Sequence, residues 1–315
     1  MLKYVIVRLL WLFFMWIFIF TLVYFALTIA SWTSWNRPTP DFWQNMRFLF
    51  FEYLEYVKGI VTRGDFGRYR AWSLWDALML GARRTFSINI MAFIFYMVGS
   101  ILIGSVAALK RNTLFDRGLM GVLLVIGSIP NFVWIFAFML VFSYQLGWFP
   151  SMPQPSDVTT YVGRLHQMVM PAVALALLPL SKFTLLIRNE LTETFESDYS
   201  LLLKTKGMNE WQMLTRHHLK NAVVPILPEL TPTVYFVIAG SFLLEIINNV
   251  AGLSMLLWTS LFTPVMGGHS MTINVTVATG VVGVYAALGL VFVFFIDMMY
   301  RLFDPRINIG SKKMG

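Results

Sequence analysis

The chain has 315 residues, of which 57% are hydrophobic and 13% are charged, against about 25% charged residues in an ordinary soluble domain. With a mean hydropathy of +0.67, this composition argues against a soluble globular enzyme and excludes intrinsic disorder and collagen-like repeats. The formal net charge of +8 comes from basic residues that flank apolar segments, so we predict contact with membrane lipid and no nucleic acid partner. The absence of Cys excludes disulfides, thiolate metal sites and a Cys nucleophile.

Long apolar runs dominate the sequence. A helix needs roughly 20 apolar residues to cross a bilayer core of about 30 Å, because lipid offers no partner to unpaired backbone groups. The first run, residues 9–30, follows Lys3 and Arg8 and has no clean cleavage site after it, so we interpret it as an uncleaved anchor. Further runs cover residues 88–109, 118–142, 169–187, 226–247 and 273–300. The sequence therefore predicts an all-α, polytopic membrane protein with about six transmembrane helices.

Basic residues near the ends of the runs predict the orientation. Lys and Arg gather at the N-terminus, around residues 110–117 and 188–220, and after residue 300. We therefore expect these segments, including both termini, in the cytoplasm. The long loop after the first run is also basic, but at this length a loop no longer follows the rule. We interpret it as an external scaffold on the membrane, with a binding site as the alternative, because Trp32, Trp35, Trp43, Trp72 and Trp75 suit a membrane interface.

The predicted spans carry little chemistry of their own. Lys182, Glu229, Glu245 and Asp297 are placed toward the ends of spans, where they would not bind an ion at mid-membrane. The four His have no HExxH spacing, and no GxxxxGK[ST] motif exists to hold ATP phosphates. We therefore predict no catalytic residue, no metal site and no enzyme activity in this chain. Pro130, Pro171 and Pro179 are expected to bend their helices.

The longest inner loop, residues 189–221, has the pattern of two short helices. Asp198 is predicted to N-cap a helix over residues 199–206, which Gly207 ends in a left-handed conformation. The run Leu201, Leu202 and Leu203 is expected to form an exposed apolar ridge, the usual mark of a protein partner. The alternative is that this ridge folds back on its own chain.

The second helix of this loop starts at a capping box. Asn209 and Gln212 have the spacing in which each side chain accepts a bond from the backbone of the other. A shared face is predicted for Trp211, Leu214, His218 and Ala222, up to Pro225 at the membrane.

Several segments in order resemble the oligopeptide and dipeptide ABC importer permeases. Residues 198–208 and 216–225 are similar to this family's version of the EAA loop, which its members present to an ATPase. Residues 64–67 (GDFG), 146–150 (LGWFP) and 303–307 (FDPRI) resemble the family's GDLG, LGxLP and LDPRI pieces. The long loop after the first span is more like the B-type permease than its C-type partner.

The resemblance implies a type I ABC importer permease fold and a set of partners. These are a second, C-type permease subunit, two ABC ATPase subunits that hold ATP and Mg, and an extracellular solute-binding protein. It implies a location in the bacterial cytoplasmic membrane and half of a translocation pathway for peptides. It also divides the chain into an N-terminal helix with its external loop (1–84), a permease core with the coupling loop 189–221 (85–300), and a cytoplasmic tail (301–315).

The resemblance also selects candidate site residues. The predicted contact with the ATPase consists of Asp198, Tyr199, Leu202, Leu203, Lys204 and Gly207. Glu245 and Gly252 are candidates for an outer gate. This sequence has Leu201, Leu202 and Leu203 where the family has Arg, Thr and Ala, and residues 248–254 depart from the family's FSWPGLG segment. We therefore expect an adapted ATPase groove.

Other functions remain open at the level of sequence. A self-sufficient secondary carrier or channel would give flux without ATP, although the sparse charge of the spans argues against it. An intramembrane enzyme has no paired carboxylate or Ser/His arrangement in its favour. Within the ABC class, export is the alternative to import, and nickel or a metal chelate, glutathione-like thiols and sugars are the alternatives to peptides.

Overall fold

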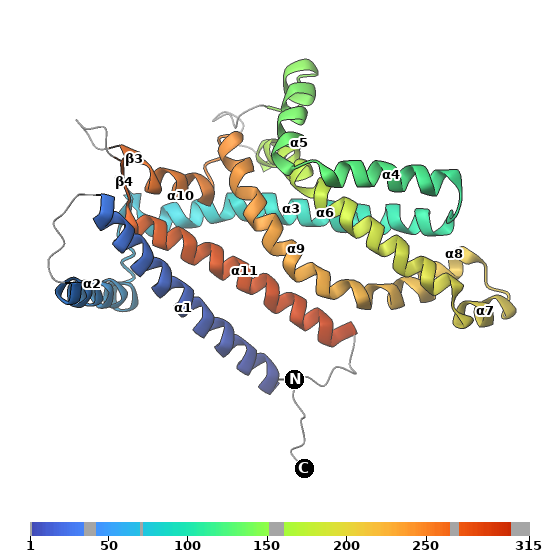
Figure 1. Cartoon of the computed structure of the whole chain (residues 1–315), viewed down its shortest axis with the longest axis horizontal. Helices are drawn as coiled ribbons and strands as arrows, with labels where there is room; N and C mark the ends of the chain where they lie inside the picture. The colour runs from blue at the N-terminus through green and yellow to red at the C-terminus, as the bar shows by residue number, and fades with distance from the viewer. Residues whose placement is uncertain (1, 35–41, 70–71, 151–160, 265–270, 304–315) are drawn as a thin grey trace, which may run out of the picture. The chain divides into compact units, whose positions relative to one another are not determined.

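The computed structural model describes residues 2–34, 42–69, 72–150, 161–264 and 271–303 (Figure 1). The chain divides into two compact units. The first contains residues 1–87 and 245–291, and the second contains residues 88–244 and 292–315.

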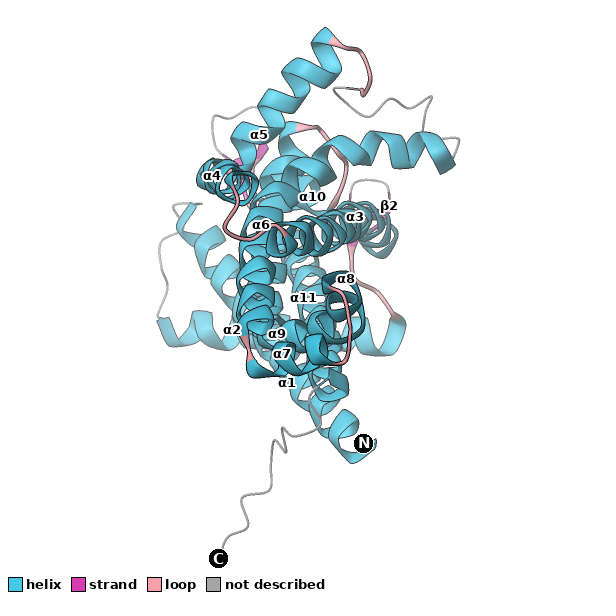
Figure 2. Ribbon diagram, turned by 90° about the vertical axis from the view of Figure 1, so that its right-hand side faces the viewer, coloured by secondary structure: helices cyan, strands magenta, loops and turns pink. Residues whose placement is uncertain are grey.

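Helix is the dominant structure throughout the described residues, as Figure 2 shows, and the expected all-α class is confirmed. The α-helices are α1 Leu2–Ser34, α2 Phe42–Arg63, α3 Leu74–Leu109, α4 Leu114–Ser128, α5 Asn131–Phe138, α6 Tyr161–Glu196, α7 Asp198–Thr205, α8 Glu210–Met213, α9 Leu219–Ile247, α10 Leu253–Leu261 and α11 Val275–Phe303. Two π-helical segments are η1 Met139–Gln145 and η3 Leu214–His218. Two small antiparallel ladders pair β1 Arg68–Tyr69 with β2 Trp72–Ser73, and β3 Thr263–Pro264 with β4 Met271–Thr272.

Within the described residues, five helices are long and apolar enough to cross a membrane: Tyr4–Ser31, Leu74–Leu109, Leu165–Glu196, Glu210–Ile247 and Val275–Met299. A sixth crossing arises if the bent pair Leu114–Ser128 and Asn131–Gln145 counts as one span. The expected number of about six is therefore confirmed as five or six.

The bent pair corrects the expectation of one continuous span over residues 118–142. Its two helices meet at 99°. Ile129, between them, is extended with φ −92° and ψ 126°, because the ring of Pro130 disfavours helical geometry in the preceding residue. Pro171 and Pro179, by contrast, remain inside the continuous helix α6.

The first unit is built around the packing of α1 on α2 and around an apolar cluster. The aromatic rings of Tyr24 and Tyr53 lie 5.2 Å apart between centroids, and the hydroxyl groups of Thr21 and Tyr53 share a hydrogen bond of 2.6 Å. Since Tyr53 belongs to α2, the long loop after α1 contains a helix that packs on the first span. The cluster combines α3, α10 and α11 through Leu74, Leu78, Leu253, Val277 and Val281.

The second unit is organised around α6. Ser181 of α6 donates a hydrogen bond to the carbonyl of Leu123 in α4. Gly104 of α3 approaches α6 so closely that an added Cβ would lie 2.9 Å from Ile187. Helices without bulky side chains at such points can come close enough to exchange hydrogen bonds inside the membrane.

An ion pair closes the turn between α3 and α4 in this unit. Asp116 has a side chain that is only 2% exposed, and it accepts hydrogen bonds from Arg188 of α6 at 2.5 and 3.1 Å. The same carboxylate accepts the backbone N–H of Asn112 at 3.1 Å, a residue with a positive φ of 66°. The pair therefore fixes both the turn and the distance between α4 and α6.

Replacing Arg188 with Ala should destabilise the protein strongly, because it leaves the Asp116 carboxylate buried without its cation. Breaking one side of a buried pair costs about 3–5 kcal/mol. Thermal unfolding of the purified protein in detergent measures the loss. The double variant Arg188→Ala and Asp116→Ala should recover part of it, and equal melting of wild type and Arg188→Ala would contradict the assignment.

Candidate functional site

The loop between α6 and α9 contains α7, whose two ends are fixed by the backbone. Its N-cap is Ser197, with an extended φ of −72° and ψ of 154°. This corrects the prediction that Asp198 caps the helix. Asp198 is its first residue, where a carboxylate still interacts favourably with the helix dipole. Ser197 uses its hydroxyl instead to donate to the carbonyl of Thr194 at 2.7 Å.

The C-terminal end of α7 is a Schellman motif, as the position of Gly207 predicts. Gly207 has a φ of +80°. Its N–H donates to the carbonyl of Lys204 at 2.9 Å, and the N–H of Met208 donates to the carbonyl of Leu203 at 3.3 Å. These two bonds satisfy carbonyl groups that the end of a helix leaves unpaired. The direction in which the chain leaves α7 is therefore defined.

The apolar ridge of α7 is divided between two faces. Leu201 and Leu202 are 64% and 52% exposed, whereas Leu203 is 4% exposed. The prediction of a fully exposed ridge is therefore wrong for Leu203, which folds back on its own chain together with Ser200. The reason is the helical period, since Ser200 and Leu203 lie three residues apart on one face. Exposed on the other sides are Asp198, Tyr199 and Lys204.

Two histidines attach α7 to the helix that follows. The Ser200 hydroxyl lies 3.3 Å from Nε2 of the buried His218, and the Tyr199 hydroxyl lies 3.0 Å from Nδ1 of His217. His218 also packs edge-on against Phe195 of α6, with ring centroids 4.6 Å apart. Sequence analysis missed these pairings, although the adjacent His residues at the end of the loop were visible as a signal. These contacts of His217 and His218 connect α6, α7 and η3 to one another.

The helix after α7 consists of the short α-helix α8 followed by the π-helical segment η3. The predicted capping box is confirmed, with the Gln212 N–H donating to Asn209 Oδ1 at 2.8 Å and the Asn209 N–H donating to Gln212 Oε1 at 3.2 Å. The predicted common face is wrong for Trp211, which is 61% exposed while Leu214 and His218 are buried. The π-helical turn η3 begins at Leu214, directly after α8.

The candidate gate residues Glu245 and Gly252 are brought together in the first unit. Glu245 is fully buried, and its Oε2 accepts the N–H of Ser254 at 3.0 Å, in the first turn of α10. The N–H of the preceding residue, Leu253, donates a hydrogen bond to Thr85 Oγ1 at 2.9 Å. A buried helix end must have such partners. Thr85 and Ser254 are partners in this arrangement that the sequence did not indicate.

Gly252 leaves the space that this arrangement requires. A Cβ at position 252 would overlap the Glu245 carboxylate and lie 2.7 Å from Thr85 Oγ1. Only a residue without a side chain therefore allows the carboxylate to approach the start of α10. The geometry assigns Glu245 and Gly252 a common structural task, and their role in gating remains a prediction.

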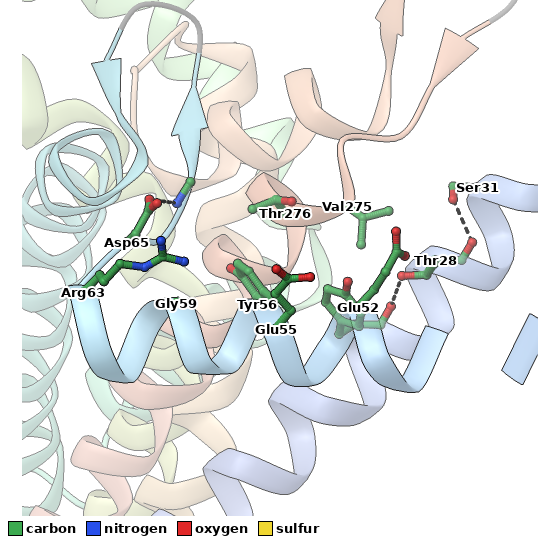
Figure 3. Close-up of a pocket in the computed structure, with 12 residues that line it drawn as sticks. Thr28, Ser31, Glu52, Glu55, Tyr56, Gly59, Arg63, Asp65, Val275 and Thr276 are labelled. Carbon is green, nitrogen blue, oxygen red and sulfur yellow. Dashed lines mark hydrogen bonds between the residues drawn. The ribbon is translucent and has the colours of Figure 1, made fainter. Parts of the chain in front are cut away.

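A cavity of about 560 Å³ lies in the first unit, in the segment for which a binding site was the alternative (Figure 3). Glu52, Glu55 and Arg63 of α2 line it together with Asp65, which accepts the N–H of Gly67 at 2.9 Å. Burial raises the pKa of Glu52, and the nearby Glu55 carboxylate raises this pKa further. The cavity is acidic, but the described residues offer no second feature that identifies a ligand.

Replacing Gly252 with Ala should destabilise the protein by about 1–3 kcal/mol, the usual cost of forcing an extra methyl group into a packed site. Thermal unfolding in detergent measures this loss. A matched control is Gly121→Ala in α4, where an added Cβ meets no atom within 4 Å. Unchanged melting of Gly252→Ala would show that the Glu245 carboxylate does not occupy the site described here.

Comparison with known proteins places this geometry in a family. Residues 100–309 match the family model of the binding-protein-dependent transport system inner membrane component. The dipeptide transport system permease protein DppB of Lactococcus lactis is 28% identical over 98% of this chain and 100% of its own length. The oligopeptide transport system permease protein OppB of Salmonella typhimurium is 26% identical over 82% of this chain and 80% of its own length.

A solved structure agrees at the level of the fold. The inward-facing MetNI methionine ABC transporter is similar over 72% of this chain and 96% of the matched chain, with a TM-score of 0.55 and 16% identity. This likeness confirms the expected type I ABC importer permease fold. Because the family model covers well over half of its residues, the chain belongs to the family of binding-protein-dependent transport system inner membrane components.

Proposed function

We propose that this chain is the B-type permease subunit of an ATP-driven importer of peptides. It forms half of the translocation pathway beside a second, C-type permease subunit. Two ATPase subunits bind ATP and Mg, and an extracellular solute-binding protein delivers the cargo. The protein lies in the bacterial cytoplasmic membrane with both termini in the cytoplasm. The names of its relatives, which are dipeptide and oligopeptide permeases, support peptides as the cargo.

The observation that carries the proposal is the form of α7. Its Leu201 and Leu202 are exposed apolar side chains on a helix whose opposite face is attached to the body of the second unit by Leu203 and Ser200. Apolar side chains in this position suit a groove on another protein. Because α7 is attached to the second unit on one side and would be bound by the ATPase on the other, it can transmit a movement of the ATPase to the permease.

Coupling then follows from rigid packing. When ATP closes the pair of ATPase subunits, each subunit displaces the helix that it holds. His217 and His218 join α7 to η3, and His218 also packs on Phe195 of α6. We therefore expect α7 to move with these helices and not to bend alone. Packed elements change between discrete arrangements, so the displacement switches the pathway between its two openings.

Leu202 and Leu203 provide a matched pair for testing the docking surface. Leu202→Ala should leave thermal unfolding unchanged but weaken copurification with the ATPase subunits about tenfold, since truncation at a docking hot spot costs about 1–2 kcal/mol. Leu203→Ala should lower stability by about 2–5 kcal/mol, as expected for a buried Leu. If Leu202→Ala binds the ATPase as wild type does, the proposed docking surface is wrong.

Substitutions at Gly207 test whether the geometry of α7 couples the ATPase to transport. Gly207→Val should cost about 1–2 kcal/mol locally, because a β-branched residue resists a φ of +80°, and it should abolish ATP-driven uptake in vesicles. Gly207→Asn should retain most of the uptake, since Asn tolerates the left-handed conformation. Normal uptake by the Val variant would contradict the mechanism.

Cargo identity needs a direct measurement. Mass spectrometry of ligand trapped in the purified assembly should recover short peptides. Recovery of a sugar, a glutathione-like thiol or a nickel chelate alone would overturn the peptide assignment and leave the importer assignment intact.

A further inference from the structure

Two opposite charges meet on apolar helices of the second unit. Lys182 of α6 and Glu229 of α9 form an ion pair with an Nζ to Oε2 distance of 2.6 Å. Sequence analysis placed Glu229 outside the centre of its span, but the apolar helix that contains it, Glu210–Ile247, continues in both directions. Measured along the helices, Lys182 lies about 9 Å from Arg188, and Glu229 lies about 13 Å from Lys220.

Both charged side chains are accessible at the surface of the second unit. The side chains of Lys182 and Glu229 are 51% and 42% exposed. Between Pro171 and Arg188, the other residues of α6 are buried or intermediate, and Lys182 is the exposed position. The neighbouring helices therefore leave this stretch of α6 most accessible at the position of the ammonium group.

Lipid does not suit this surface. Charged groups inside the hydrocarbon region are costly and face water or protein. A Lys at this depth can extend its long side chain to the membrane surface, but the ammonium group of Lys182 is instead bonded to Glu229. The same bond holds the Glu229 carboxylate beside the ammonium group, between the two apolar helices.

The backbone of α9 provides an independent indication. Pro225, Pro228 and Pro232 lie inside this helix, and all three are exposed. Their spacing puts them on one face, next to Glu229. Since proline has no N–H, the carbonyl groups four residues before each one lose their helical donors. These carbonyls belong to Asn221, Val224 and Pro228, and lipid cannot satisfy them.

We propose that the Lys182–Glu229 pair and the proline face of α9 form a contact site for short zwitterionic peptides on the translocation pathway. Lys182 receives the peptide carboxylate, Glu229 receives the peptide ammonium group, and the proline-freed carbonyls accept peptide N–H groups. The identity of the cargo rests on the proposed function.

Charge complementarity selects this occupant. Without cargo, the two side chains neutralise each other. A zwitterion offers each of them a replacement partner, so the pair opens without leaving a charge unpaired. A neutral sugar would have to separate the charges with no such compensation. Because both side chains are about half exposed, water weakens their interactions, which lets the cargo leave again.

Thiol labelling tests whether the pair faces a watery pathway. The chain has no native Cys, so Lys182→Cys and Glu229→Cys each introduce a single target in the assembled transporter with Cys-free partners. Val98→Cys in α3 is the control, because Val98 is 52% exposed and belongs to an apolar span. A charged methanethiosulfonate reagent should modify positions 182 and 229 at least about tenfold faster than position 98, since apolar surroundings suppress the reactive thiolate.

The dipeptide alanyl-alanine, supplied with the binding protein and ATP, should slow labelling at positions 182 and 229. Labelling as slow as at position 98 would assign the pair to lipid or to the partner permease and overturn the proposal. Fast labelling that the dipeptide does not change would overturn the substrate contact.

Charge removal tests which group binds which end of the peptide. Glu229→Gln should lower uptake of alanyl-alanine about tenfold, the effect of losing one charge-assisted hydrogen bond, but should spare the N-acetylated dipeptide. Lys182→Gln should spare the C-amidated dipeptide in the same way. Rates are compared with wild type for the same peptide, so delivery by the binding protein cancels.

Equal losses for all peptides would indicate a purely structural ion pair and overturn the proposal. Wild-type vesicles distinguish the two levels of inference. If wild type imports peptides with ATP and the variants show no such pattern, only the contact site is wrong. If wild type imports no peptide, the proposed function itself fails.

Discussion

The need to pair backbone polar groups inside a membrane governs this structure. A helix that crosses lipid pairs its own N–H and C=O groups, so a break or an end is tolerated only where protein or water replaces the lost bonds. The buried start of α10, a helix end enclosed by protein, shows what the same need for partners requires outside a continuous helix. It requires the Glu245 carboxylate, the Thr85 hydroxyl and the missing side chain of Gly252. Exceptions of this kind are informative because the chain must commit several residues to each one.

The same constraint separates rigid parts from parts that meet other molecules. On α7, the backbone bonds around Gly207 and the buried Leu203 hold the helix against the second unit, which is the basis for proposing its exposed Leu202 as a docking residue. On α9, the prolines remove N–H donors from the helix, which is the basis for proposing a polar cargo contact there. The first proposal concerns a lasting apolar contact, and the second concerns a transient polar one.

Sequence reasoning reached the fold because its signals are local. Apolar length located the spans, and the Asn209 capping box and the left-handed Gly207 were predicted correctly, since both depend on residues within one turn. It failed where the answer depended on another helix. The burial of Leu203 required a neighbour to cover it, and neither this burial nor the exposure of Trp211 follows from spacing along one helix. The break at Pro130 was expected only as a bend, because sequence does not set its angle.

The Lys182–Glu229 pair marks the limit of that reasoning most clearly. Along the chain, each residue is an isolated charge near a predicted span end, and each alone reads as a side chain that reaches toward the membrane surface. The distance of 2.6 Å between Lys182 Nζ and Glu229 Oε2 depends on how α6 packs against α9, which the sequence does not show. Once the two charges face each other, each has its partner, and neither needs the membrane surface. The proposed contact site adds that a zwitterionic cargo offers both charges a replacement partner, which a neutral molecule does not.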